Sequence, residues 1–324
     1  MALDILLVLI ATVTIMLSWC NRLEAKDLFV IPHYKVLQDP QDKRILEKEA
    51  CSRIGLTGVP WDWSTGGDPG ARHTPRLLRD NIYASPDYSP SKGQLTCKPK
   101  DYGDIILYPR DWEKTKRAIR EASRKLFEEN KFTIFLGGDH SITGPILGGL
   151  LDVYDCVGLV MLDAHFDLRS ISGGVTSGSW LYDLYQEQRD RIKTVIIGIG
   201  EYSNPSYLAN RAKELEIRFH GVRDVWFRIE EIYKDLEDLK ETCPIHYVTL
   251  DIDHLDSAYA PGVNSPSSPG LHPRETIQIL DYVLDNMNVK GADIVEIVPI
   301  KDNGGKTIRL ASKLALYMLH GVIS

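Results

Sequence analysis

The sequence lacks the features that mark several large classes of protein. Its five cysteines are odd in number and include no C-x-x-C pair, which argues against a disulfide framework and a cysteine zinc site. It has no basic block, and a net charge of −7 offers nothing that would attract a nucleic-acid backbone. No G-x-G-x-x-G or G-K-[ST] motif follows Gly137-Gly138, so nucleotide binding is disfavoured. We therefore expect an ordinary globular protein that does not bind nucleic acid.

Long apolar runs are also scarce, and the longest stands at the N-terminus. Ile5–Cys20 carries no charge, but as a helix it would span roughly 24 Å, short of the ~30 Å core of a bilayer. Its length suits a signal peptide, yet Asp4 stands where a basic residue is expected. Cleaved export, a membrane anchor, an oligomer-packing helix and a wrongly assigned start stay open. We expect residues 1–27 to be a hydrophobic extension and the protein to be cytoplasmic. If Ile5–Cys20 is an anchor, we expect membrane contact there with the catalytic domain still in the cytoplasm.

From Cys51 onward, short apolar runs alternate with helical stretches. The runs have the near-continuous apolar character of strands buried on both faces of a parallel sheet: Phe132–Leu136, Val157–Leu162, Thr194–Ile199, Ile245–Leu250 and Ala292–Ile297. The helical stretches are Asp111–Asn130, Pro205–Glu216, Pro273–Met287 and Lys306–His320. This alternation predicts a three-layer α/β/α sandwich with a doubly wound, mainly parallel sheet. We expect residues 28–324 to form a single catalytic domain.

Acidic and imidazole side chains collect where the predicted strands end. They are His140 after the first strand, Asp163, His165 and Asp167 after the second, Asp251 and Asp253 after the fourth, and Glu296 within the last. In open α/β sheets, ligands bind beyond the carboxyl ends of the strands. Residues two apart on an extended chain point the same way, so each aspartate pair can converge on one site. The pattern predicts a functional site at this edge of the sheet.

Two imidazoles and four carboxylates in one place point to bound metal ions. A lone Asp-x-Asp is more often a helix cap or a turn, but several carboxylates buried together would cost several kcal/mol each without cations. The set carries more negative charge than one cation needs, and oxygen ligands with a minority of nitrogen favour Mn²⁺ over tetrahedral Zn²⁺. Two such ions can share a water molecule and lower its pKa. The sequence therefore predicts a hydrolase with two Mn²⁺ per subunit.

Three motifs resemble the signatures of the ureohydrolase family, which includes arginase, agmatinase and formimidoylglutamase. They are GGDHS (Gly137–Ser141), DAHFD (Asp163–Asp167) and DIDHLDSAYAPG (Asp251–Gly262), and the similarity extends over about Cys51 to Leu319. The resemblance implies the following division of ligands: His140, Asp163, Asp167 and Asp253 hold one metal or bridge both, and His165, Asp251 and Asp253 serve the second. It also implies that Asp167 orients the attacking water and passes on its proton, and that Glu296 accepts hydrogen bonds from an amidine substrate. The family's habit suggests a homo-oligomer, a trimer or a hexamer.

The loop Leu168–Leu184 bears on the substrate. Arginase- and agmatinase-like members carry a histidine there in an H-G context, whereas this chain has Ser177-Gly178. A D-x-R followed by S-G resembles formimidoylglutamase, and Arg169 offers a positive fork for the carboxylates of a glutamate moiety. A surface or interface ion pair is the other reading of Arg169.

We expect hydrolysis of a small linear amidine, N-formimidoyl-L-glutamate, to L-glutamate and formamide, a step of histidine breakdown. The alternatives are an agmatinase- or guanidino-acid-type hydrolase that releases urea, and a metal-free homologue that only binds. The presence of all six expected ligands and of Glu296 argues against the metal-free homologue.

Overall fold

The computed structural model describes residues 44–171 and 173–323, and the statements below concern these residues. The described residues, from Arg44 onward, form one compact unit. The predicted hydrophobic extension, including Ile5–Cys20, lies outside the described residues. Within them, every helix is too short or too polar to cross a bilayer.

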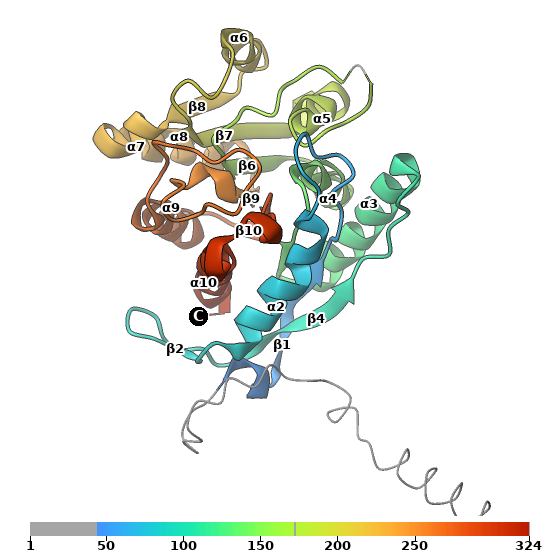
Figure 1. Cartoon of the computed structure of the whole chain (residues 1–324), viewed down its shortest axis with the longest axis vertical. Coiled ribbons are helices and arrows are strands. Elements are labelled where there is room, and N and C mark those ends of the chain that lie inside the picture. Colours follow the sequence, from blue (N-terminus) through green and yellow to red (C-terminus); the bar gives the residue numbers. More distant parts are fainter. Residues whose placement is uncertain (1–43, 172, 324) are drawn as a thin grey trace, which may run out of the picture. The chain divides into compact units, whose positions relative to one another are not determined.

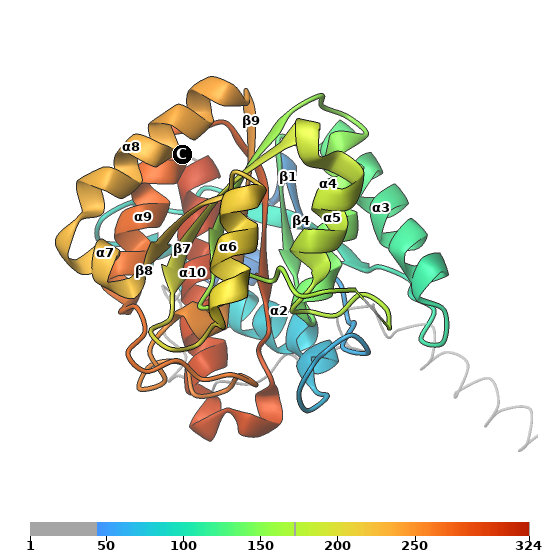
Figure 2. The same cartoon turned by 90° about the horizontal axis from the view of Figure 1, so that it is seen from above.

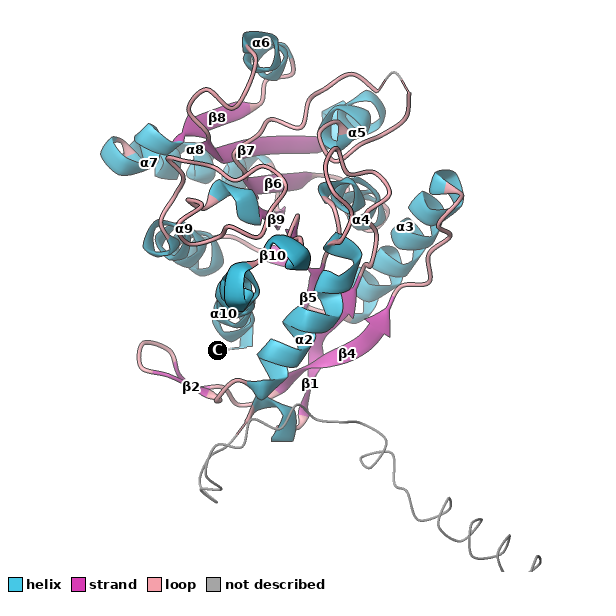
Figure 3. Cartoon of the chain, viewed as in Figure 1, coloured by secondary structure: helices cyan, strands magenta, loops and turns pink. Residues whose placement is uncertain are grey.

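The centre of the unit is a sheet of eight strands whose hydrogen-bonded neighbours all run parallel (Figures 1 and 3). In spatial order the strands are β4 (Lys98–Asp104), β1 (Ala50–Gly58), β5 (Phe132–Leu136), β10 (Val289–Val295), β9 (Ile245–Asp251), β6 (Val157–Leu162), β7 (Ile192–Ile199) and β8 (Arg218–Gly221). The four strands that carry the expected site residues, β5, β10, β9 and β6, are therefore neighbours at the middle of the sheet. A short antiparallel hairpin, β2 (Tyr88–Ser89) and β3 (Gly93–Gln94), stands apart from it.

Helices cover both faces of this sheet, which confirms the three-layer α/β/α prediction (Figure 2). One face packs against α2 (Thr74–Ala84), α7 (Val222–Phe227), α8 (Ile229–Thr242), α9 (Pro273–Asn286) and α10 (Lys306–Ile323). The other packs against α3 (Trp112–Glu129), α4 (Thr143–Leu151), α5 (Trp180–Gln188) and α6 (Ser206–Glu214). Side chains alternate between the two cores along a strand: Ile134 and Leu136 of β5 lie in the first and Phe135 in the second.

All five predicted strands and all four predicted helices occur, with ends that move by a few residues. The Asp111 carboxylate caps α3 by accepting the backbone N–H of Lys114 at 2.9 Å. The last strand ends at Val295, not Ile297, so Glu296 follows the strand instead of lying within it. Its φ of 65° lies outside the extended region, so the Glu296 side chain does not continue the alternation of side chains along β10.

The sequence argued against a disulfide framework, but the structure contains two disulfide bonds. Cys51, in β1, is bonded to Cys97, just before β4, and Cys156, just before β6, is bonded to Cys243, just after α8. The odd count misled because it excludes pairing of only one of the five cysteines and leaves four that can pair. Both bonds lie toward the amino ends of the strands, at the edge of the sheet opposite the expected site. They therefore tie the scaffold together without lining that site.

Candidate metal centre

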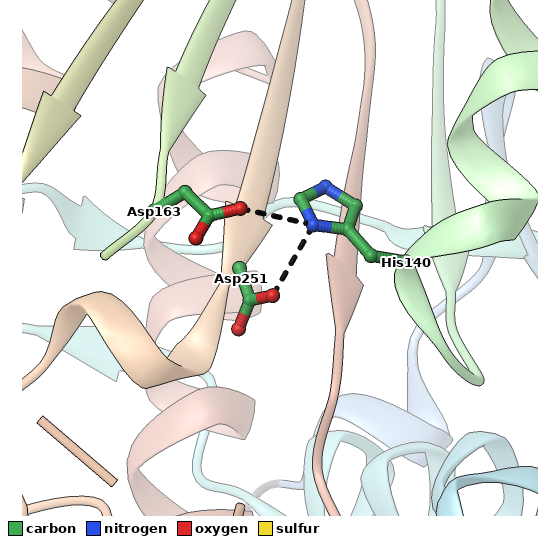
Figure 4. Close-up of side chains that lie close together, drawn as sticks. All are labelled: His140, Asp163 and Asp251. Atoms are coloured by element: carbon green, nitrogen blue, oxygen red, sulfur yellow. Dashed lines mark ion pairs between the residues drawn. The ribbon is translucent and has the colours of Figure 1, made fainter. Parts of the chain in front are cut away.

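The carboxyl ends of three central strands, β5, β9 and β6, bring the predicted ligands together. His140 begins a single helical turn directly after the Gly137-Gly138-Asp139 segment that follows β5, with Asp139 as its cap. Asp163 is the first residue after β6, and Asp251 is the last residue of β9. Figure 4 shows the imidazole of His140 pointing at the carboxylates of Asp163 and Asp251. The strand-end rule thus predicted this meeting correctly.

The first group of ligand atoms surrounds Nδ1 of His140. This nitrogen lies 3.1 Å from Oδ2 of Asp163, 3.0 Å from Oδ2 of Asp167 and 3.2 Å from Oδ2 of Asp251. All four residues are buried. Three side chains of this group, His140, Asp163 and Asp251, can offer one atom each to a single ion.

A second group surrounds Nδ1 of His165, which lies 3.0 Å from Oδ2 of Asp253 and 3.5 Å from Oδ1 of Asp163. Asp163 therefore presents one oxygen to each group, as a carboxylate between two ions would. Asp253 lies with His165, as the resemblance implied, whereas Asp251 lies with His140 and not with the His165 group to which it was assigned. The cause is local: a helical turn, Ile252–His254, begins directly after Asp251, so Asp251 and Asp253 are not on one extended strand.

The donor atoms fit divalent cations. Nδ1 of His140 and Oδ2 of Asp163 are fully buried and make no hydrogen bond within the described residues, although buried polar atoms are normally satisfied. Burial, together with the neighbouring charge of Asp163, raises the pKa of Asp167 to about 6. Burial and repulsion by Asp253 and Asp163 likewise raise the pKa of Asp251 well above its ordinary value. Cations between these oxygens would remove the repulsion and bond the unsatisfied atoms.

Two acids at the centre are held in defined positions. The indole N–H of Trp180 donates to Oδ2 of Asp167 at 2.7 Å, and Asp167 itself has a φ of 50°. Glu296 accepts the backbone N–H of His140 at 2.7 Å, and its own N–H donates to the carbonyl of Gly138 at 2.9 Å. Burial, together with the charge of Asp139, raises the pKa of Glu296 to about 8. Both carboxylates line the cavity beside the candidate ligands.

That cavity has a volume of about 370 Å³, and the three predicted substrate contacts all line it. The backbone N–H of Arg169 donates to the carbonyl of Gly178 at 3.0 Å, and that of Ser177 donates to the carbonyl of Ser64 at 2.9 Å. The Arg169 stem lies over Gly178, where an added Cβ would come within 3.2 Å of it. Arg169 is exposed and has no acidic partner within the described residues, so no ion pair inside this part of the chain holds its side chain.

Sequence reasoning did not find two asparagines that shape the same cavity. Asn204 donates to the carbonyl of Ala164 at 2.8 Å and so supports the segment that carries His165. Asn264 donates to Oγ1 of Thr65 at 3.0 Å and accepts from the Lys301 ammonium at 2.7 Å. Both stand in loops far along the chain from the residues they support, and their spacing carries no signal.

Comparison with known proteins places the fold and the site in a family. The arginase family model matches residues 52–321. An agmatinase of Bacillus cereus is 32% identical over 279 residues, which is 83% of this chain and 92% of that protein. A formimidoylglutamase of Halalkalibacterium halodurans is 30% identical over 83% of this chain and 86% of that protein. The solved formimidoylglutamase of Bacillus subtilis superposes with a TM-score of 0.84 at 25% identity, covering 92% of this chain and 97% of that one. With these matches and the paired ligand groups, the chain belongs to the arginase family and is one of its hydrolases of linear amidines.

Proposed function

We propose that the protein hydrolyses N-formimidoyl-L-glutamate to L-glutamate and formamide. The observation that carries this proposal is Arg169, an exposed cation without an acidic partner in the described residues, on the wall of the cavity that holds the ligand groups. A substrate that ends in carboxylates would supply the missing partner. The adjoining Ser177-Gly178, in place of histidine-glycine, supports the same choice.

The side chains that would hold two Mn²⁺ ions follow from the two ligand groups. The first ion would have His140, Asp163, Asp167 and Asp251, and the second would have His165, Asp163 and Asp253. Carboxylate-rich sets of this kind suit Mn²⁺. Bound there, the cations would act as Lewis acids and lower the pKa of a water molecule.

The remaining residues would orient the substrate and move protons. A formimidoyl group is a planar cation, and the buried Glu296 carboxylate can accept hydrogen bonds from its N–H groups. Asp167 would accept the proton of the attacking water and deliver it to the glutamate nitrogen as the C–N bond breaks. The hydrogen bond from Trp180 fixes the orientation that this transfer needs.

Arg169 also distinguishes the alternatives. Agmatine ends in an ammonium group, which a nearby guanidinium repels, so agmatine fits this cavity poorly. A guanidino acid ends in a carboxylate and remains the second candidate. Because its product is urea and not formamide, product analysis separates the two.

The test is turnover by the Mn²⁺-loaded protein of formimidoylglutamate, 4-guanidinobutyrate, agmatine and L-arginine, with formamide and urea measured separately. We expect formamide from the first substrate and little urea from the others. Arg169→Met should raise KM for formimidoylglutamate about 10- to 100-fold, as expected for one charge-assisted contact. Arg76→Met, at a solvent-exposed position on α2, is the matched control. Urea from agmatine or L-arginine with no formamide would reject the proposal.

The two disulfides bear on the compartment, for which cytoplasm was the expectation. Disulfides persist in oxidising compartments and are rare in the cytosol. We therefore propose that the domain matures in an oxidising compartment, which agrees with the export alternative for Ile5–Cys20. Thiol alkylation of the protein taken directly from its native source, without reductant, tests this. Failure of Cys156 and Cys243 to react with the alkylating reagent supports the proposal, because disulfide-bonded sulfurs are not alkylated. Alkylation of the cysteines of both bonds contradicts it.

We also propose a homo-oligomer, a trimer or a hexamer. Light scattering behind a sizing column measures its mass, and a monomeric mass would contradict the proposal.

A further inference from the structure

The second ring nitrogen of His140 faces away from the candidate metal site. Its Nε2 lies 2.9 Å from Oγ1 of Thr249, on β9, and that hydroxyl lies 2.5 Å from Oδ1 of Asp293, on β10. All three side chains are fully buried, with exposed fractions of 0%. The contacts therefore form a chain that is closed to water, from a buried carboxylate through one hydroxyl to the imidazole.

The direction of the hydrogen bonds along this chain follows from the surroundings of Asp293. Its other oxygen, Oδ2, lies 2.8 Å from the hydroxyl of Thr143 and 3.0 Å from that of Tyr247. A carboxylate only accepts, so all three hydroxyls donate to it. The single hydrogen of Thr249 is then used, and its oxygen can only accept from His140. The opposite direction would require a proton on Oδ1 of Asp293.

We propose that Asp293, acting through Thr249, is a positioning residue that keeps the His140 proton on Nε2 and the lone pair on Nδ1. This is the nitrogen that faces Asp163, Asp167 and Asp251. A metal-binding histidine commonly donates its other N–H to a carboxylate, which fixes the tautomer and the ring orientation. Here a threonine hydroxyl stands between them. The inference rests on the proposed metal site, and its test below can fail while that site stands.

The second ligand histidine differs and serves as an internal control. His165 is partly exposed, and its Nε2 has no hydrogen-bond partner within the described residues. Changes at Asp293 or Thr249 should therefore weaken the His140 group and leave the His165 group unchanged.

The variants test the chain of contacts one group at a time. Thr249→Val removes the hydroxyl at nearly constant shape, and Asp293→Asn introduces an amide that can donate to Thr249 and reverse its hydroxyl. Each should weaken Mn²⁺ binding about 10- to 100-fold at the site of the His140 group and leave the site of the His165 group unchanged. Titration calorimetry on metal-stripped protein measures the two affinities. Thr249→Ser keeps the hydroxyl, and Tyr247→Phe removes one donor to Asp293 but leaves the path to His140. Both should bind Mn²⁺ within about threefold of wild type.

A measurement on the wild-type protein tests the inference even if the variants fail to fold. With ¹⁵N-labelled histidine and diamagnetic Cd²⁺ as the probe, His140 should show a slowly exchanging proton on Nε2. A proton on Nδ1 of His140 would overturn the inference. So would Mn²⁺ affinities of Thr249→Val and Asp293→Asn equal to that of the wild type. In either case, binding of two Mn²⁺ ions by the wild-type protein would still support the proposed metal centre. Wild-type protein that binds no Mn²⁺ would overturn both.

Discussion

Asp163 is the carboxylate that both candidate ligand groups share, so its replacement tests them together. Its two oxygens lie 3.1 Å from Nδ1 of His140 and 3.5 Å from Nδ1 of His165. Asp163→Asn keeps the size of the side chain but removes its charge and one ligand oxygen. We expect this variant to lose Mn²⁺ binding at both groups. Asp253→Asn changes a ligand of the His165 group and should lose only that site.

The size of the effect follows from mass action. A ligand present at 100 times its Kd adds about 2.7 kcal/mol to the free energy of unfolding, so two occupied sites add about 5 kcal/mol. At roughly 2 °C per kcal/mol for a domain of this size, Mn²⁺ should raise the wild-type Tm by about 10 °C. The shift should be about half as large for Asp253→Asn and close to zero for Asp163→Asn.

The assay is calorimetric melting of each protein after chelator treatment and again after Mn²⁺ addition, so that every variant is compared with its own metal-free form. Asp155→Asn, at an exposed position, is the matched control and should shift as wild type does. A full Mn²⁺ shift in Asp163→Asn would refute the shared role of Asp163. No shift in wild type would refute the ligand groups themselves.

Three other perturbations have defined outcomes. The pKa of Glu296 is about 8 in the fold and 4.5 ordinarily, so the metal-free folded state binds an extra proton, and its free energy of unfolding should fall as pH rises through that window. Glu296→Gln should flatten this pH dependence of the melting temperature, and an unchanged slope would contradict the assignment. Removing the Cys51–Cys97 bond, which joins residues 46 apart, should lower the free energy of unfolding in urea by about 4 kcal/mol, whereas no loss in the double serine variant would argue against the bond. Trp180→Phe removes the donor to Asp167 and should reduce kcat about tenfold with little change in KM; a KM effect alone would assign Trp180 to binding.

The central strands could be predicted because strands covered by helices on both faces are apolar along their whole length. The edge strand β4 could not, since its sequence KPKDYGD is largely polar and exposed. Strand β1 could not be predicted for the same reason: its first half carries the exposed Ser52 and Arg53, although its second half is buried. Burial of both faces is therefore the property that sequence reasoning detected.

The meeting of the candidate metal ligands could be predicted because the rule about strand ends is geometric and needs no contact information. Their division into two groups could not, because it depends on a helical turn after Asp251 that the spacing Asp-x-Asp does not reveal. Asp293 offered a signal that was not used: a lone acid inside an apolar strand has to find partners. Its partner Thr249 lies on a neighbouring strand, and only the register between β9 and β10 shows that the two residues pair.

The account depends most on two cations held by two overlapping ligand groups. Anomalous diffraction at the manganese edge from crystals grown with Mn²⁺ locates such ions directly. We predict two peaks, one beside Nδ1 of His140 and one beside Nδ1 of His165, with the Asp163 carboxylate in contact with both. A single peak, or none between these side chains, would contradict the account.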